Sequence, residues 1–278
     1  MQLTPRYGSD PIITLDGPPS AVAAPVIRQR RRLAAVLSSL DDAQWAAPTR
    51  CDGWSVRDVV LHLDSTNGFW AYSMTSGLRG EPTEVLASFD PVATPALLVA
   101  AEGDVSGTAA LERLQRSTEA LVELWDSLDD AGWATTAEAP PGHVTISALA
   151  HHALWDSWIH ERDILLPLGI EQEVVEDEVA AALRYVAALA PAFGVSVATS
   201  NQGVLAIAAT RPDLSFHVTV DGHAAVREGD AHADLRLEGD AVELLEGLSL
   251  RRPLDREIPS EAAWLVAGLA TAFDAARS

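Results

Sequence analysis

The chain has 278 residues, and its 40 acidic side chains outnumber its 19 basic ones, all of them arginine, which gives a formal net charge of −21. This charge repels nucleic-acid phosphates and anionic membrane surfaces, so we expect neither as a partner. Hydrophobic residues make up 48% of the chain and charged residues 21%, which is typical of a folded globular protein, and the length predicts two domains.

The cysteine content and the N-terminal residues narrow the class of protein further. The single cysteine, Cys51, has no partner for an internal disulfide, so a metal site would have to use histidine and carboxylate ligands. The first residues lack a basic patch followed by an apolar run, which argues against a signal peptide. The sequence contains no uncharged apolar stretch of about 18 residues, so we expect no membrane span. We therefore expect a cytoplasmic protein.

The first elements follow from spacing and capping signals. Residues 1–24 are rich in Pro, Gly and small side chains, and they predict a flexible extension. Apolar residues at helical spacing predict a first helix over 24–40. Ser55 stands before an apolar run, as an N-cap should, and predicts a second helix over 56–73.

An internal repeat organises the first half of the chain. The segment SLDDAQW, ending at Trp45, recurs as SLDDAGW, ending at Trp133. Each copy closes an amphipathic helix and is followed by a loop and a capped helix. Two such units predict a four-helix bundle with pseudo-twofold halves. The repeat places His62 and His152 at equivalent positions.

After Gly194 the pattern changes from helical spacing to alternation. Apolar and polar residues alternate up to Asp221-Gly222, a hairpin turn signal, and Asp240 is placed as a helix N-cap. The predicted elements of this part are helices over 173–190, 240–248 and 261–276, with strands over 214–220 and 235–237. The chain is thus predicted to be an α+β protein with a flexible extension (1–24), a four-helix bundle (25–170), and a linking helix with a small α+β domain (171–278).

The strongest chemical signal lies on the fourth predicted bundle helix. His152, Asp156 and His160 are spaced four residues apart, and Asp163 follows nearly one turn later, so all four share one helix face. Two of these groups and a histidine from a second helix would form a three-ligand metal site with open positions, and His62 is that histidine. Asp163 would orient His160 by accepting a hydrogen bond from it.

Other candidates have simpler explanations. A lone histidine is more often hydrogen-bonded or solvated than a metal ligand, and this ordinary explanation suits the loop, strand and turn histidines His143, His217, His223 and His232. The histidine stripe beside Trp155 and Trp158 is harder to explain in that way.

Cys51 and three arginines remain weaker candidates. Cys51 precedes the second helix without a marked base nearby, which favours a structural thiol over a nucleophile. Arg79, Arg251 and Arg252 are candidates for binding an acidic cofactor or substrate, although a solvated arginine is the default interpretation.

The segment from Cys51 to Leu63, CDGWSVRDVVLHL, resembles the signature of the mycothiol-dependent maleylpyruvate isomerase family, whose members are DinB-like metal-binding four-helix bundles. The later run of Asp156, His160 and Asp163 is similar to the second element of that family. The C-terminal stretch also resembles a sterol-carrier-like second domain. The resemblance covers about residues 25–275.

The resemblance implies a divalent metal, usually zinc, held by His62, Asp156 and His160. This chain has Asp156 where the family usually has Glu, and the carboxylate therefore reaches about one methylene less far. His152 is the neighbouring group that would compensate as a further ligand.

The resemblance also implies mycothiol as a thiol cosubstrate. A free thiol titrates near pH 8.5, and coordination to a divalent cation deprotonates it at neutral pH. The resulting thiolate would attack a small electrophilic substrate, as an S-transferase or as a cis–trans isomerase. Two alternatives from other classes stay open: a non-catalytic metal- or ligand-binding module, and a metal-dependent hydrolase that activates water.

Overall fold

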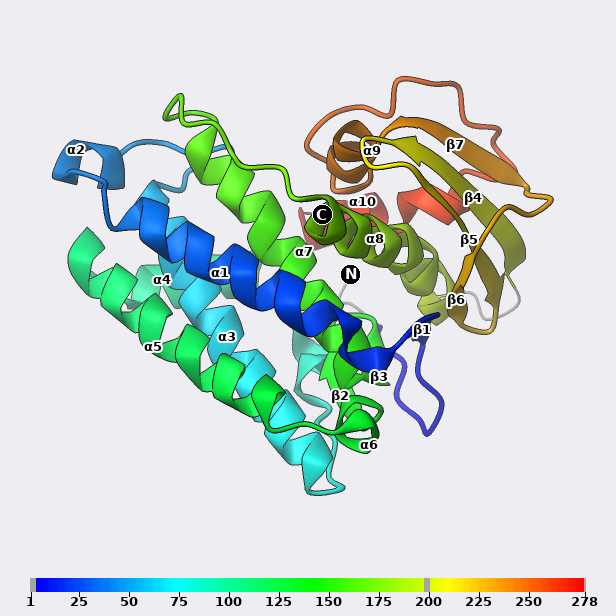
Figure 1. Cartoon of the computed structure of the whole chain (residues 1–278), viewed down its shortest axis with the longest axis horizontal. Coiled ribbons are helices and arrows are strands. Elements are labelled where there is room, and N and C mark those ends of the chain that lie inside the picture. The colour runs from blue at the N-terminus through cyan, green and yellow to red at the C-terminus, as the bar shows by residue number, and fades with distance from the viewer. Residues whose placement is uncertain (1–3, 198–200, 278) are drawn as a thin grey trace.

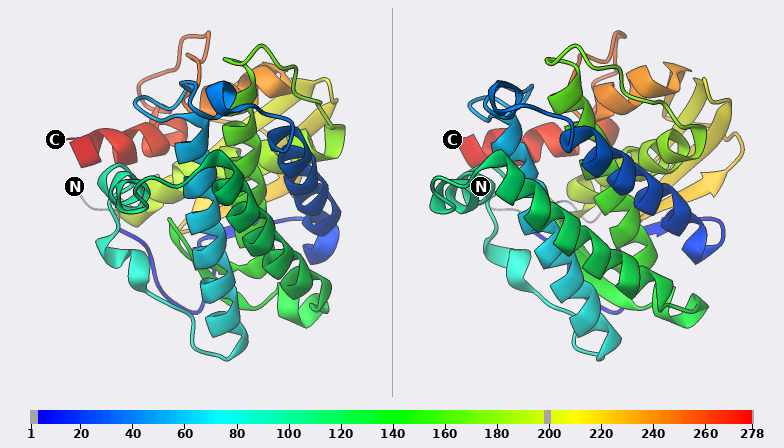
Figure 2. Two further views of the ribbon diagram at one scale, coloured as in Figure 1. Left: turned by 90° about the vertical axis from the view of Figure 1, so that its left-hand side faces the viewer. Right: turned by 60° about the vertical axis from the view of Figure 1, so that its left-hand side comes forward.

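Four long helices form the bundle that the sequence predicts in the first part of the chain (Figure 1). The computed structural model describes residues 4–197 and 201–277. Figure 2 shows the four helices lying side by side, with the later part of the chain packed against one end and one side of them. The bundle helices are α1 (Ala23–Leu37), α3 (Val56–Leu78), α5 (Gly107–Asp126) and α7 (Ile146–Leu165).

The sequence repeat folds twice into the same local structure. It forms the short helices α2 (Asp42–Trp45) and α6 (Asp130–Trp133), each capped by the side chain of the preceding aspartate. Both tryptophans that close the repeat are buried, so each anchors its turn in the core. The pseudo-twofold relation of the two halves therefore has a structural counterpart.

Helices α3 and α7 run antiparallel and bring distant residues together. His62, near the start of α3, lies against His160 with 5.1 Å between ring centroids, whereas Trp70, further along α3, lies 5.0 Å from His152. Ser55 and Thr145 are the N-caps of the two helices, and His62 and His152 follow their caps at the same distance in sequence. The equivalent histidines thus occupy different surroundings.

Several elements were not predicted. A hairpin of β2 (Thr136–Ala139) and β3 (Gly142–Thr145) occupies part of the loop before α7. Helix α4 (Ala93–Ala101) and the short 3-10 helix η2 (Val85–Ser88) lie in a segment for which no element was predicted, and the 3-10 helix η1 (Pro19–Val22) lies in the predicted extension. The second helix, α3, is also longer than the predicted 56–73, because its buried face continues through Met74 and Gly77.

The second part of the chain is a five-stranded sheet with helices on one side (Figure 1). The predicted strands are present as β5 (Leu214–Asp221) and β7 (Leu235–Asp240), and the Asp221-Gly222 signal marks the antiparallel turn into β6 (Ala224–Glu228). Strand β4 (Gln202–Thr210) was missed, because a central strand reads as a continuous apolar run rather than as an alternation. The sheet order is β1-β6-β5-β4-β7.

Three helices complete this part. Helix α8 (Glu176–Val197) lies between the bundle and the sheet, and α9 (Ala241–Leu248) begins at the predicted cap Asp240, whose side chain accepts hydrogen bonds from two backbone amides. Helix α10 (Trp264–Arg277) starts three residues later than predicted. The α+β two-domain fold expected from the sequence is therefore confirmed.

The expectation of a flexible extension is wrong for part of residues 1–24. Strand β1 (Ile13–Leu15) pairs in parallel with β6, and Ile12 and Ile13 are buried. The apolar run from Ile12 to Leu15 is too short to stand out among the surrounding prolines and glycines, yet the exposed edge of β6 gives it hydrogen-bond partners. Residues 13–15 of the predicted extension are therefore part of the sheet.

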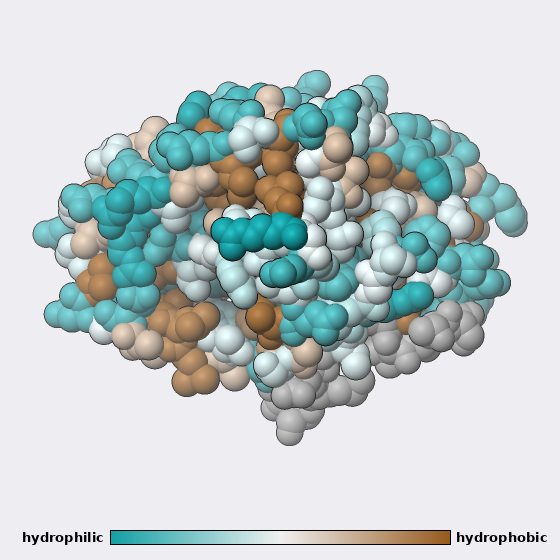
Figure 3. Space-filling view, turned by 90° about the horizontal axis from the view of Figure 1, so that it is seen from below, coloured by the Kyte–Doolittle hydropathy of each residue, from teal (hydrophilic) through white to brown (hydrophobic). Residues whose placement is uncertain are grey.

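Helix α8 is apolar along most of its length. Within the described residues, Glu176–Val195 is the one segment whose length and hydropathy would suit a membrane span. Most of this segment is buried between the sheet and the bundle, as expected for the core helix of a folded protein. The face of the molecule in Figure 3 is largely polar, with separate apolar patches.

The buried His151 on α7 predicts a pH dependence of stability. Burial lowers its pKa to about 4, and its Nδ1 donates to the carbonyl of Ser147 at 2.8 Å. In the unfolded chain the pKa is about 6.5, so the unfolded state takes up the proton first and the folded state loses stability as the pH falls from about 6.5 to 4. We expect His151→Gln to remove up to about 3 kcal/mol of this loss. Urea unfolding of both proteins at pH 7 and pH 4.5, with a chelator present, measures the difference; parallel pH profiles would contradict it.

Candidate metal centre

The capped start of α3 fixes the position of His62. Ser55 and Asp58 form a capping box, in which each side chain bonds the backbone amide of the other. This box starts the helix at Val56 and places His62 nearly two turns into it, facing α7. The indole of Trp54 lies 5.3 Å from the His62 ring and flanks it from the preceding loop.

Three predicted ligands come together between α3 and α7. His62, Asp156 and His160 each present one ligand atom, and these atoms all lie within 4.8 Å of one another. His160 Nε2 is 3.6 Å from Asp156 Oδ1, so that ring nitrogen faces the carboxylate. One nitrogen or oxygen donor from each of three residues is the ligand pattern of an open divalent metal site.

The residues present fit a metal ion for a second reason. Asp156 Oδ2 is buried and has no hydrogen-bond partner. Burying a carboxylate oxygen without a hydrogen-bond partner costs free energy, and a metal cation bound to that oxygen would offset this cost. The donor set, two imidazoles and one carboxylate, suits zinc and related divalent ions.

Asp163 lies on the far side of His160. Its Oδ2 accepts a hydrogen bond from His160 Nδ1 at 3.1 Å, the position expected from the sequence for an orienting group. The same oxygen is 3.3 Å from Cys51 Sγ, and Cys51 Sγ is 3.5 Å from His160 Nδ1. Cys51, His160 and Asp163 therefore form a second close group that shares the imidazole of the first.

Arg251 reaches the centre from the second part of the chain. Its Nε and Nη2 donate to Asp163 at 2.8 to 3.1 Å, so both carboxylate oxygens are engaged. Burial alone would raise the pKa of Asp163, but the hydrogen bonds from His160 and Arg251 hold it well below its ordinary value. Asp163 is therefore a fixed anion that links α7 to the turn after α9.

The surroundings of the centre shift the pKa values of its two histidines in opposite directions. Burial lowers the pKa of His62 to about 4, so this ring is neutral at physiological pH. Burial also disfavours the charged form of His160, but its hydrogen bond to Asp163, with Cys51 and Asp156 nearby, raises the pKa to about 10. Although burial disfavours its charged form, Asp156 has a lowered pKa because histidines surround it.

Further contacts join the two parts of the chain beside the centre. Glu246 on α9 accepts hydrogen bonds from Arg50 at 2.7 Å and from Arg162 at 2.9 Å. The indole of Trp155 donates to Ser249 Oγ at 2.8 Å. These bonds surround the Arg251–Asp163 pair, so the second part of the chain forms one side of the centre.

His152 lies apart from the three close ligands. Its Nδ1 is hydrogen-bonded to Tyr185 OH at 2.7 Å, and the rings of Trp70, Trp155 and Tyr185 surround it at about 5 Å between centroids. Burial lowers its pKa to about 4. His152 therefore does not join the close group of His62, Asp156 and His160, and its place as a compensating ligand has no support in this geometry.

The three candidate arginines have different places. Arg79 is exposed at the C-terminal end of α3, far along that helix from His62. Arg252 pairs with Glu243 at 2.8 Å on the outside of α9. Only Arg251 reaches the centre, and it does so through Asp163. The sequence suggested that Cys51 is structural, but its thiol lies beside His160 and Asp163 at the centre. Its position directly before the motif from Trp54 to His62 is the feature of the sequence that could have indicated this place.

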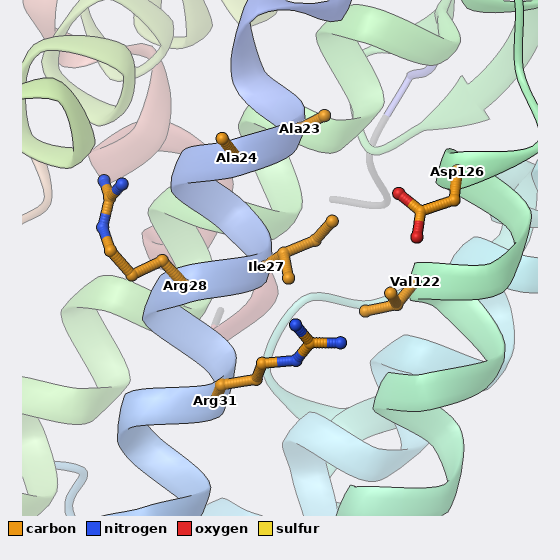
Figure 4. Close-up of a pocket in the computed structure, with 7 residues that line it drawn as sticks. All are labelled: Ala23, Ala24, Ile27, Arg28, Arg31, Val122 and Asp126. Carbon is orange, nitrogen blue, oxygen red and sulfur yellow. The ribbon is translucent and has the colours of Figure 1, made fainter.

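Histidines outside the centre have ordinary roles. His143 is buried and bonds backbone groups of Gly8 and Thr83. His217 and His223 bond nearby carbonyls, and His232 is exposed. A separate open groove of about 640 Å³ lies between α1 and α5 (Figure 4), and the arginines beside it are paired with Glu119, Asp177 and Glu178.

Comparisons with known proteins give the family and the fold of the chain. Residues 26–165 match the family described as Mycothiol maleylpyruvate isomerase N-terminal domain. Two solved structures are similar: a mycothiol-dependent maleylpyruvate isomerase, at 17% identity and a TM-score of 0.60, and a histidine-to-alanine mutant of such an enzyme, at 16% and 0.58. The first match covers 88% of this chain and 96% of that one, and the second covers 83% and 88%. No curated protein matches the chain.

Proposed function

Since the chain belongs to the family of the Mycothiol maleylpyruvate isomerase N-terminal domain, which matches residues 26–165, we propose that it is a metal-dependent enzyme with mycothiol as its thiol cosubstrate. The reaction is S-transfer to, or cis–trans isomerisation of, a small electrophilic substrate. The observation that carries this proposal is the close group of His62, Asp156 and His160, with a buried and unpartnered oxygen on Asp156.

These three residues would hold the ion, and a divalent ion held there lowers the pKa of a thiol so that a thiolate is present at neutral pH. His62 enters as a neutral ligand because burial keeps its pKa low. Asp163 accepts a hydrogen bond from His160 Nδ1, so Nε2, which faces Asp156 and the centre, is the nitrogen that would give up its proton to bind the ion. Arg251 holds Asp163 in the orientation that this requires.

Three further points belong to the proposal. The metal is zinc, given two imidazoles and one carboxylate. The boundary between the two domains lies near residue 170, between the end of α7 and the start of α8. The protein is cytoplasmic, where a low-molecular-weight thiol would be reduced and available.

The ligand assignment predicts the metal content of variants. We expect His62→Ala to lose stoichiometric zinc, because two remaining ligands hold a divalent ion poorly. His232→Ala, at an exposed histidine, is the matched control and should keep the wild-type content. Elemental analysis after dialysis measures both. Undiminished zinc in His62→Ala would refute the assignment.

The function itself is tested with metal-loaded protein, mycothiol and a panel of activated alkenes and alkylating electrophiles. Loss of free thiol with formation of a conjugate supports S-transfer, and isomerised alkene with unchanged thiol supports isomerisation. Metal binding without either reaction would favour a binding module. Hydrolysis of an ester or amide panel without mycothiol would favour a hydrolase.

A further inference from the structure

Arg30 is an arginine inside the helical bundle. It lies on α1 and is 3% exposed. Its Nη1 donates to Asn67 Oδ1 on α3 at 2.5 Å, and its Nη2 donates to the carbonyl of Ala153 on α7 at 3.2 Å. Both acceptors are neutral, and within residues 4–197 and 201–277 no carboxylate forms an ion pair with this guanidinium. A buried arginine without a paired carboxylate is unusual.

The carboxylate that acts on Arg30 from a distance is Asp156. Burial lowers the pKa of Arg30 to about 10, and the charge of Asp156 opposes this shift. Each residue also has one buried atom without a hydrogen-bond partner, Nε of Arg30 and Oδ2 of Asp156. The two charges therefore compensate one another across the bundle interior without touching.

We propose, on the basis of the function proposed above, that Arg30 tunes the metal centre electrostatically: its positive charge, held against α7 one turn before Asp156, favours the anionic form of a thiol bound at the centre. Arg30 contacts the backbone of α7 at Ala153, one turn before Asp156, and it contacts none of the three ligand side chains. It acts through its charge rather than through a bond to ligand or substrate.

The size of the effect follows from the Coulomb interaction. Two unit charges about 10 Å apart, at an effective dielectric constant of about 20, shift a pKa by about one unit. The same field disfavours a divalent cation. Removing the charge should therefore raise the pKa of a bound thiol and make metal binding tighter. General damage to the site would instead weaken metal binding, so the two effects can be distinguished.

Several other charged or titratable groups surround the centre, and they are the same in the wild type and in a variant of Arg30. They are His62 on α3, His152, Asp156, His160 and Asp163 on α7, Tyr185 on α8, Arg50 and Cys51 in the loop before α3, and Arg251 after α9.

The test uses the whole protein loaded with Co²⁺ and 2-mercaptoethanol as the thiol. The pH midpoint of the thiolate-to-cobalt absorption band and the dissociation constant of Co²⁺ are measured for the wild type and for Arg30→Met. We expect a midpoint about one unit higher and Co²⁺ binding about a hundredfold tighter in Arg30→Met, because a divalent ion feels twice the interaction of a unit charge. Arg30→Gln, which is uncharged but keeps an N–H donor, should shift in the same way and replaces Arg30→Met if that variant does not fold.

Asn67→Leu is the matched control, because it removes the hydrogen-bond acceptor and keeps the charge. Its midpoint should stay at the wild-type value. An unchanged midpoint in the uncharged variants, or an equal shift in Asn67→Leu, would overturn the role of the Arg30 charge while leaving the proposed function standing. A wild-type protein that binds no Co²⁺ would overturn both.

Discussion

His160→Ala should reduce mycothiol-dependent turnover by at least about a thousandfold, which corresponds to about 4 kcal/mol of lost transition-state stabilisation. His160 is the imidazole common to both close groups, with one nitrogen toward Asp156 and the other toward Asp163 and Cys51. Its removal takes away a metal ligand and leaves Asp163 without its hydrogen-bond donor on α7. The measurement is the rate of electrophile consumption at fixed mycothiol, with metal content determined in the same preparation.

Chelation of the wild-type protein should produce a loss of the same order, and re-addition of zinc should restore the rate. Cys51→Ser is the informative control, because Cys51 touches the same imidazole but the thiol is supplied by the cosubstrate. It should retain most of the activity. Full activity after verified metal removal, or a loss confined to Cys51→Ser, would contradict the mechanism.

The second large effect should come from Arg251, which lies in the other part of the chain from the ligands. Arg251→Met removes the hydrogen bonds that hold Asp163, and Asp163 holds the Nδ1 proton of His160. Loss of such a group supporting a ligand lowers metal affinity by about 10- to 100-fold. Competition with a chromophoric zinc chelator measures the affinity.

Arg252→Met supplies the control beside it. Arg252 is the next residue, but it pairs with Glu243 away from the centre, so its loss should leave zinc affinity unchanged. Equal effects of the two substitutions would show that the arginines act through the stability of the α9 segment. Thermal unfolding of the two metal-free variants separates that outcome from a change at the centre.

The bundle and its ligands could be predicted because each depends on local sequence. Ser55 and Asp240 cap the helices that they were expected to cap, and the repeated segment folds twice into the same capped turn. His62, Asp156 and His160 were assigned from helical spacing and the family resemblance, and they lie close together here; their role as ligands stays a prediction.

What could not be predicted depends on contacts between distant segments. Nothing local in the sequence connects Arg251 with Asp163, because the pairing exists only once α9 has packed beside α7. The burial of Arg30 among neutral hydrogen-bond acceptors could not be predicted either, since an arginine in a helical pattern is expected at the surface. The two equivalent histidines also differ because α7 places His160 beside His62, whereas α3 places Trp70 beside His152.

Strand β1 has a consequence for the synthesis of the protein. Its partner β6 is made about 200 residues after it, so the edge of the sheet cannot close until β6 has left the ribosome. During that interval the apolar residues Ile12 and Ile13 have no sheet to pack into. Deleting residues 13–15 would therefore act about 200 residues further along the chain, where it would leave an open strand edge on β6.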